Sequence, residues 1–138
     1  MGINCIWLLP FYQSDDRDNG YDVEDYYSIN KNLGNFDDFM KFKREAEKRD
    51  MRLLIDLIVH HTSNTHPWFK LASHNKNSKY FNYYIWSSAP PSLPDENVFQ
   101  GKPWTYCPMN DRYYHHIFYD FQPDLNIKIP MLEKKLKK

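Results

Sequence analysis

The sequence has few of the features that mark nucleic-acid-binding, membrane or disulfide-rich proteins. Its 18 basic side chains balance 18 acidic ones, whereas binding to nucleic acid or to a membrane surface requires excess positive charge. The two cysteines, Cys5 and Cys107, are too few for a disulfide framework or a metal knuckle. No signal-peptide pattern and no apolar run of about 20 residues is present. We therefore expect a soluble, cytoplasmic protein with no nucleic-acid or membrane partner.

Aromatic side chains, in contrast, are abundant and make up 17% of the 138 residues. Such an excess fits a large core, or flat surfaces that bind flat ligands such as sugars or bases. The length is that of one ordinary domain, and no repeat or low-complexity tract divides it.

Two apolar segments, residues 3–9 (INCIWLL) and 51–59 (MRLLIDLIV), are predicted strands, each buried on both faces. Apolar side chains recur at helical spacing between them and predict a helix over residues 36–49, with Asn35 as its N-cap. Strand, helix and strand form a βαβ unit, whose strands are parallel. The predicted class is α/β.

Polar residues follow each predicted strand, at 18–22 and at 60–63. Ligands of α/β sheets bind at the carboxyl ends of strands, so we expect both clusters to face one space. Residues 62–121 are irregular and predict a loop-rich excursion with no helix beyond about two turns. Pro130 can begin a final helix.

Each cluster also has a purely structural interpretation. Asn19 and Gly20 favour a tight turn, and residues 104–126 could form only an aromatic hairpin and a loop. Asp56, inside a predicted strand, could pair with Arg52 or with an arginine outside this chain, or it could tune an active site.

The six histidines invite a zinc hypothesis, which their spacing disfavours. Zinc requires three or four converging ligands. Neighbouring residues of a strand point to opposite faces, so neither His60 and His61 nor His115 and His116 can converge on one ion.

Four segments resemble the α-amylase family of glycoside hydrolases in order and spacing: GINCIWLLPFY, DNGYDVEDY, DLIVHHTSNTHPWF and FQPDLN. The likeness extends over residues 2–136 and is strongest to the α-glucosidase and trehalose synthase (maltose glucosyltransferase) branch. The segment QPDLN, residues 122–126, is similar to a signature of oligo-1,6-glucosidase-like members, and the pattern DxxxxH that ends at His61 is similar to another family signature.

This resemblance implies a partial (β/α)8 barrel with a loop-rich inserted B domain. Residues 1–61 correspond to strand two, helix two and strand three of the barrel. Residues 62–121 correspond to the inserted domain. Residues 122–138 return to the barrel and begin helix three.

The resemblance also implies a pocket for a non-reducing glucose. Asp18 would accept hydrogen bonds from sugar hydroxyls, and Tyr21 would stack on the pyranose ring. His61 would donate a hydrogen bond that strengthens as charge develops in the transition state. Phe99 and Gln122 would complete the pocket from the inserted domain.

Three positions bear on the site or depart from the family pattern. Asp56 resembles a buried carboxylate that supports the site without acting in catalysis. His60 replaces an Asn that often binds calcium in the family, and imidazole is a poor calcium ligand, although Asp124 remains a candidate ligand. Asp50 replaces a Gly at a left-handed helix end, where Asp is accommodated at some cost.

Retaining glycosidases act through two carboxylates, which in this family follow strands four and five. No GxRxD-like nucleophile motif occurs here. The resemblance therefore implies a fragment that contributes glucose-binding residues to an α-glucosidase, α-amylase or trehalose synthase-like enzyme but is inactive alone. Its partners would be α-glucosides, such as maltose, trehalose or malto- and isomalto-oligosaccharides, and the rest of the barrel in the same or another chain.

Two other hypotheses remain: one half of a split glycosidase, and a non-catalytic protein that binds sugar with about millimolar affinity. The choice between α-1,4 hydrolysis, α-1,6 hydrolysis and maltose–trehalose isomerisation also remains open. Two strands alone would leave apolar edges and faces uncovered.

Overall fold

The computed structural model describes residues 2–90, 96–99 and 101–128 and divides into two compact units, Met1–Ile58 and Val59–Lys138. The helix predicted from Pro130 lies outside the described residues. Within the described part, the longest helix has 12 residues, and none is long and apolar enough to cross a membrane.

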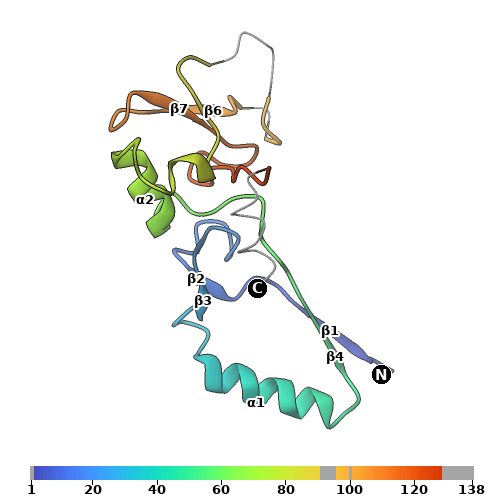
Figure 1. The fold of residues 1–138 in the computed structure, drawn as a ribbon. Helices are drawn as coiled ribbons and strands as arrows, with labels where there is room; N and C mark the ends of the chain where they lie inside the picture. The colour runs from blue at the N-terminus through green and yellow to red at the C-terminus, as the bar shows by residue number, and fades with distance from the viewer. Residues whose placement is uncertain (1, 91–95, 100, 129–138) are drawn as a thin grey trace. The chain divides into compact units, whose positions relative to one another are not determined.

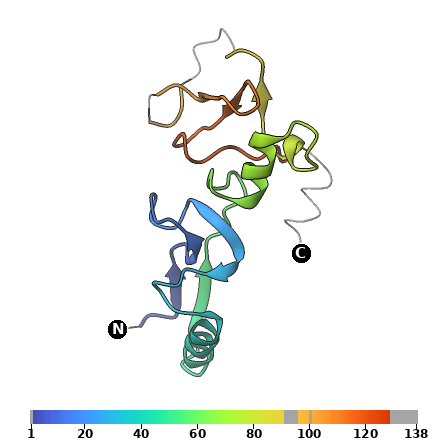
Figure 2. The same ribbon diagram turned by 90° about the vertical axis from the view of Figure 1, so that its left-hand side faces the viewer.

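The first unit contains the predicted parallel pair of strands. Strand β1 (Cys5–Leu8) pairs in parallel with β4 (Arg52–Ile55), and helix α1 (Phe36–Glu47) precedes β4 in the chain (Figure 1). The two strands run side by side in both views (Figure 2). The βαβ prediction is thus confirmed. An antiparallel hairpin that was not predicted lies between β1 and α1 in the chain and is formed by β2 (Tyr12–Ser14) and β3 (Val23–Ile29).

The prediction that the strands of residues 3–9 and 51–59 are buried on both faces is wrong, and the observed strands are shorter than these segments. Pairing ends at Leu8 opposite Ile55, two residues before Pro10, which has no N–H to donate to a ladder. Trp7 and Leu54 are 60% and 55% exposed, because a two-stranded sheet leaves faces with no neighbouring layer. The expected uncovered apolar surface is therefore present in the described part of this unit.

Residues at both ends of α1 explain where the helix begins and where it ends. The Asn35 side chain accepts hydrogen bonds from two backbone N–H groups of the first turn, and the Asp38 carboxylate accepts the backbone N–H of Asn35, forming a capping box. At the other end, Asp50 has φ of +53°, and the N–H of Met51 reaches the carbonyl of Ala46 at 3.0 Å. This is a Schellman motif with Asp in the left-handed position, as expected.

The second unit has a short helix packed beside a small sheet. Helix α2 (Pro67–His74) has eight residues, consistent with the predicted limit of two turns, and is followed by the 3₁₀ helix η1 (Phe81–Tyr83). The antiparallel sheet has the order β5 (Trp86–Ser87), β7 (Arg112–His115), β6 (Trp104–Cys107). Strands β6 and β7 form an antiparallel hairpin that is rich in aromatic residues.

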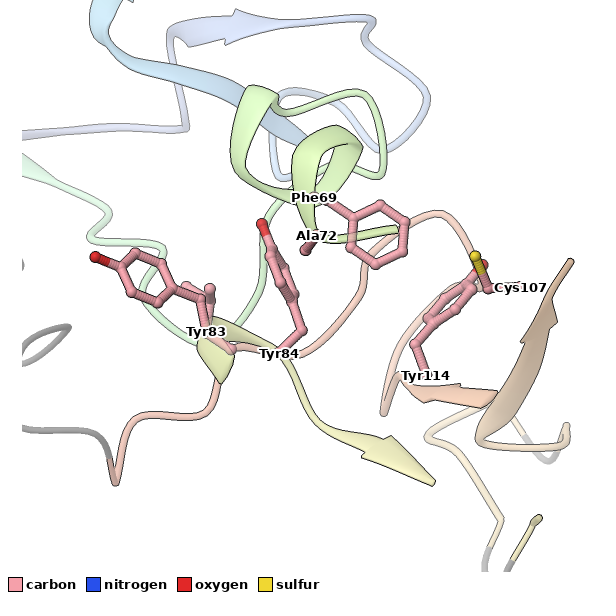
Figure 3. Packing of buried hydrophobic residues seen from close by; sticks show 7 residues of the cluster. Phe69, Ala72, Tyr83, Tyr84, Cys107 and Tyr114 are labelled. Atoms are coloured by element: carbon pink, nitrogen blue, oxygen red, sulfur yellow. The ribbon is translucent and has the colours of Figure 1, made fainter. Parts of the chain in front are cut away.

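Aromatic rings fill the core of the second unit. Figure 3 shows Phe69 and Ala72 of α2 facing Tyr84, with Tyr114 beside Cys107. The ring of Phe69 makes edge contacts with Tyr84 and Tyr114, each at 5.0 Å between centroids. Such pairs add about 0.5–1.5 kcal/mol each to the stabilisation from burial. Packing in this core therefore accounts for part of the aromatic excess of the sequence.

Candidate functional site

The polar segment after β2 forms a tight turn that positions two predicted sugar-binding residues. Asn19 and Gly20 both have positive φ, +49° and +89°, and the N–H of Tyr21 donates to the carbonyl of Asp18 at 2.9 Å. Two central residues of positive φ define a type I′ turn, for which Asn-Gly is the preferred pair. The turn prediction is confirmed, and Asp18 and Tyr21 are its two outer residues.

A buried carboxylate holds this turn in place. Asp22 is fully buried and accepts the backbone N–H groups of Arg17, at 3.3 Å, and of Asp18, at 3.1 Å. The guanidinium Nε of Arg17 lies 3.7 Å from the same carboxylate. Burial of a charge is tolerated where hydrogen bonds and an opposite charge compensate it, so Asp22 fixes the backbone of Asp18. This role of Asp22 was not predicted from the sequence.

Tyr21 is anchored through its hydroxyl group. It donates to Oδ2 of Asp56 at 2.8 Å, and the indole N–H of Trp7 donates to Oδ1 of the same residue at 2.9 Å. The hydrogen bond to Asp56, followed by partial desolvation, raises the pKa of Tyr21. The phenol therefore stays neutral, and its ring orientation is set by the carboxylate at the end of β4.

Asp56 forms hydrogen bonds with aromatic side chains. Asp56 lies immediately after β4, not inside it. Its hydrogen-bond partners in the described part are Trp7, Tyr21 and, at its carbonyl, Tyr12. The predicted pairing with Arg52 is not among the described ion pairs, and the carboxylate supports Tyr21 instead.

In the second unit, His61 lies in a short antiparallel pairing with the segment that contains Gln122 and Asp124. His61 and Asp124 form a β-bridge, and the N–H of Leu125 donates to the carbonyl of His60 at 2.8 Å. The His61 side chain is 5% exposed and makes an edge contact with the ring of Phe118 at 5.2 Å. Its imidazole is thus packed in a defined orientation.

Phe99 and Gln122 have opposite environments. Phe99 is 53% exposed and stacks on Tyr119 at 4.4 Å between centroids. Tyr119 in turn stacks on Phe121 at 5.0 Å. Gln122 is fully buried, and its side-chain oxygen accepts the N–H of Tyr119 at 3.3 Å. Exposed aromatic surface is therefore present at Phe99, while Gln122 supports the loop on which Tyr119 lies.

Asp124 is the centre of a buried polar cluster. Its carboxylate lies 2.6 Å from Nδ1 of His115 and 3.3 Å from Nδ1 of His60, and it accepts the N–H of Ile117 at 3.1 Å. Although burial opposes it, the hydrogen bonds from His115 and Ile117 and the neighbouring His60 imidazole lower the pKa of Asp124, and the nearby Asp124 carboxylate raises the pKa of His60. Among the residues that the structure describes, no group of three or more His, Cys, Asp or Glu could hold a metal ion.

One hollow of the first unit is mainly apolar and is not the predicted sugar site. It has a volume of about 450 Å³, and none of the predicted sugar-binding residues lines it. Sugar pockets require several convergent polar groups, whereas this hollow is mainly apolar, with walls that include Leu8, Phe11, Ile29, Phe39 and Phe42.

Comparison with known proteins gives the family context. The family model "Alpha amylase, catalytic domain" matches residues 1–138. The trehalose synthase/amylase TreS of Mycolicibacterium smegmatis is 36% identical over 99% of this chain and 24% of its own length. The oligo-1,6-glucosidase of Bacillus cereus is 42% identical over 91% of this chain and 23% of its own length.

A solved structure agrees with these relatives. The trehalose-6-phosphate hydrolase of Bacillus licheniformis superimposes with a TM-score of 0.90 at 40% identity, covering 96% of this chain and 25% of that one. The chain thus spans about a quarter of the length of the relatives that it matches.

Proposed function

The chain belongs to the alpha-amylase family, and on this premise we propose that it is part of a cytoplasmic enzyme that acts on α-glucosides, to which it contributes glucose-binding residues. The turn of residues 18–22 carries the proposal. Its Asn-Gly pair, the buried Asp22 and the Tyr21–Asp56 hydrogen bond pre-order two side chains that suit a sugar. Such pre-ordering reduces the entropy lost on binding.

Each proposed residue has a distinct chemical role. Asp18 accepts hydrogen bonds from sugar hydroxyls. Tyr21 presents a neutral ring to the apolar face of the pyranose. His61 donates a hydrogen bond that strengthens as charge develops in the transition state. Phe99 adds aromatic surface, and Gln122 acts at the same site through the loop of residues 119–122.

The nucleophile and the acid/base are proposed to lie in further barrel segments, either in the same polypeptide or in a second chain. Residues 1–61 then form barrel elements, residues 62–121 the inserted B domain, and residues 122–138 the return to the barrel. The exposed side chains of Trp7, Leu54 and Leu57, the last 68% exposed, support this proposal. Further strands and helices would remove this apolar surface from water, at about 25 cal/mol per Å² buried.

Binding can be tested on the 138-residue chain by NMR titration with maltose, using the β-linked disaccharide cellobiose as the ligand control. We expect maltose at millimolar concentrations to shift the ring resonances of Tyr21 and His61. The variant Asp18→Ala should abolish these shifts. Asp15→Ala is the matched control, because Asp15 is an exposed carboxylate of the same segment.

Shifts that persist unchanged in Asp18→Ala, or that appear equally with cellobiose, would show that the assignment of Asp18 is wrong. The chain alone should release no glucose from maltose or from an aryl α-glucoside, because the proposed nucleophile and acid/base lie outside it. Release of glucose that depends on a residue of this chain would contradict the proposed division of roles.

A further inference from the structure

Three aromatic side chains of the second unit form a stack at its surface. The ring of Phe99 lies on that of Tyr119, with centroids 4.4 Å apart and ring planes 20° from parallel. The ring of Tyr119 lies on that of Phe121, with centroids 5.0 Å apart and planes 7° from parallel. In the described part of the chain, no ring other than Tyr119 contacts Phe99, which is 53% exposed. One face of Phe99 is therefore supported, and the other is open to a ligand.

The backbone that carries Phe99 is fixed by Asn97. The side-chain oxygen of Asn97 accepts the N–H of Phe99 at 3.0 Å, and its Nδ2 donates to the carbonyl of Phe118 at 3.1 Å. The N–H of Val98 donates to the carbonyl of Ile117 at 2.8 Å. Phe99 therefore lies on a segment that is hydrogen-bonded to the residues just before Tyr119.

The backbone that carries Tyr119 is held from the interior of the unit. Its N–H donates to the side-chain oxygen of the fully buried Gln122 at 3.3 Å, and its carbonyl accepts the N–H of Gln122 at 2.9 Å. The hydroxyl of Tyr114, a residue of the aromatic core, donates to the carbonyl of Asp120 at 2.8 Å. Tyr119 thus gives the ring of Phe99 a support whose own position is fixed.

We propose that Tyr119 is a positioning residue for sugar binding, which holds the ring of Phe99 so that its open face meets the apolar face of a pyranose. This inference rests on the sugar-binding role proposed above for Phe99. A ligand that binds a mobile side chain must immobilise it, and that ordering lowers affinity. The stack removes this cost before the sugar arrives. Asn97 acts to the same end through the backbone, and Gln122 acts through Tyr119.

NMR of the full 138-residue chain with maltose tests the proposal. We expect nuclear Overhauser effects between the ring protons of Phe99 and C–H protons of one glucose unit. Tyr119→Ala should raise the Kd for maltose about 3- to 10-fold, and Tyr119→Phe should restore it, because a phenyl ring can form the same stack. Tyr106→Ala is the matched control and should leave the Kd unchanged, since Tyr106 is an exposed tyrosine of β6 outside the stack.

The ring resonances of Phe69, in the core of the second unit, report whether each variant is folded. Asn97→Ala is a second variant that should also raise the Kd, and it leaves all three rings of the stack in the chain. The proposal is overturned if the Kd of Tyr119→Ala equals that of Tyr106→Ala, or if Tyr119→Phe fails to restore binding.

A separate outcome distinguishes this proposal from the proposed function. If maltose shifts Tyr21 in a manner that Asp18→Ala abolishes, but shows no Overhauser effect with Phe99, the glucose-binding role of the chain stands and the positioning role of Tyr119 is wrong. If the unmodified chain shows no maltose-dependent shift that Asp18→Ala removes, both proposals fail.

Discussion

Replacement of Gly20 by Ala should disrupt the turn that presents Asp18 and Tyr21. Gly20 has φ of +89°, and a Cβ at this position would lie 2.5 Å from the backbone oxygen of Pro10. The left-handed backbone alone costs an L-residue about 1–2 kcal/mol. Relief of the contact must move backbone atoms, which adds about 1–3 kcal/mol, as overpacking does elsewhere. We therefore expect a loss of about 2–5 kcal/mol in the free energy of unfolding of the first unit.

Substitutions at two other glycines separate the cost of the left-handed backbone from the cost of the close contact. Gly2 has φ of +59° with nothing within 4 Å of an added Cβ, so Gly2→Ala tests the backbone cost alone. At Gly34 an added Cβ would lie 2.9 Å from the Asp38 carboxylate, a flexible side chain that can move at the expense of the capping box. Destabilisation should be smallest for Gly2→Ala, larger for Gly34→Ala and largest for Gly20→Ala.

The assay is urea unfolding, which is monitored through the 19F NMR resonances of fluorotryptophan. The indole of Trp7 lies in the first unit and is hydrogen-bonded to Asp56, so its resonance reports on that unit. Gly20→Ala should also abolish the maltose-dependent shift of Tyr21. Equal stability of the Gly20→Ala and Gly2→Ala variants would refute the close approach of Gly20 to Pro10.

Three further predictions follow from single contacts. Asp50→Gly should stabilise the chain by about 0.5–1 kcal/mol, measured by urea unfolding, because Gly adopts positive φ without the steric cost that Asp pays; a loss of stability would contradict the Schellman motif. The raised pKa of Tyr21 means that its hydrogen bond stabilises the fold below about pH 10 and is lost as pH rises through the raised value. In absorbance titration against Tyr21→Phe, Asp56→Asn should return the Tyr21 transition toward pH 10, and an unchanged transition would exclude Asp56 as its cause. Cys5 is exposed and Cys107 buried, so a thiol reagent should label only Cys5 before denaturation, and equal labelling rates would contradict this packing.

The sequence predicts those features whose causes are local. The limits of α1 follow from Asn35 at one end and the Asp50 position at the other, and the turn follows from Asn19 and Gly20. The parallel pairing of β1 and β4 follows from the order of elements. Each of these depends on residues that are adjacent in the chain or on the topology alone.

Features that depend on distant neighbours were not predictable. Burial of β1 and β4 depends on layers that pack against them, so apolar composition alone gave the wrong burial for Trp7. Strand β3 (VEDYYSI) alternates only partly, and its pairing with β2 contains register shifts. The cluster at Asp124 joins His60 and His115 through the fold of the second unit, and no local pattern indicates that these three side chains meet.

The central claim, that this chain supplies glucose-binding residues to a larger α-glucoside-acting enzyme, is tested most directly by the intact mass of the native protein. An antibody against residues 62–121 would capture it from its source cells for mass measurement and an α-glucosidase assay. We predict an active polypeptide or complex several-fold heavier than 16.8 kDa, because the matched relatives are about four times as long. Recovery of a 16.8 kDa chain alone, with no partner, would contradict the account.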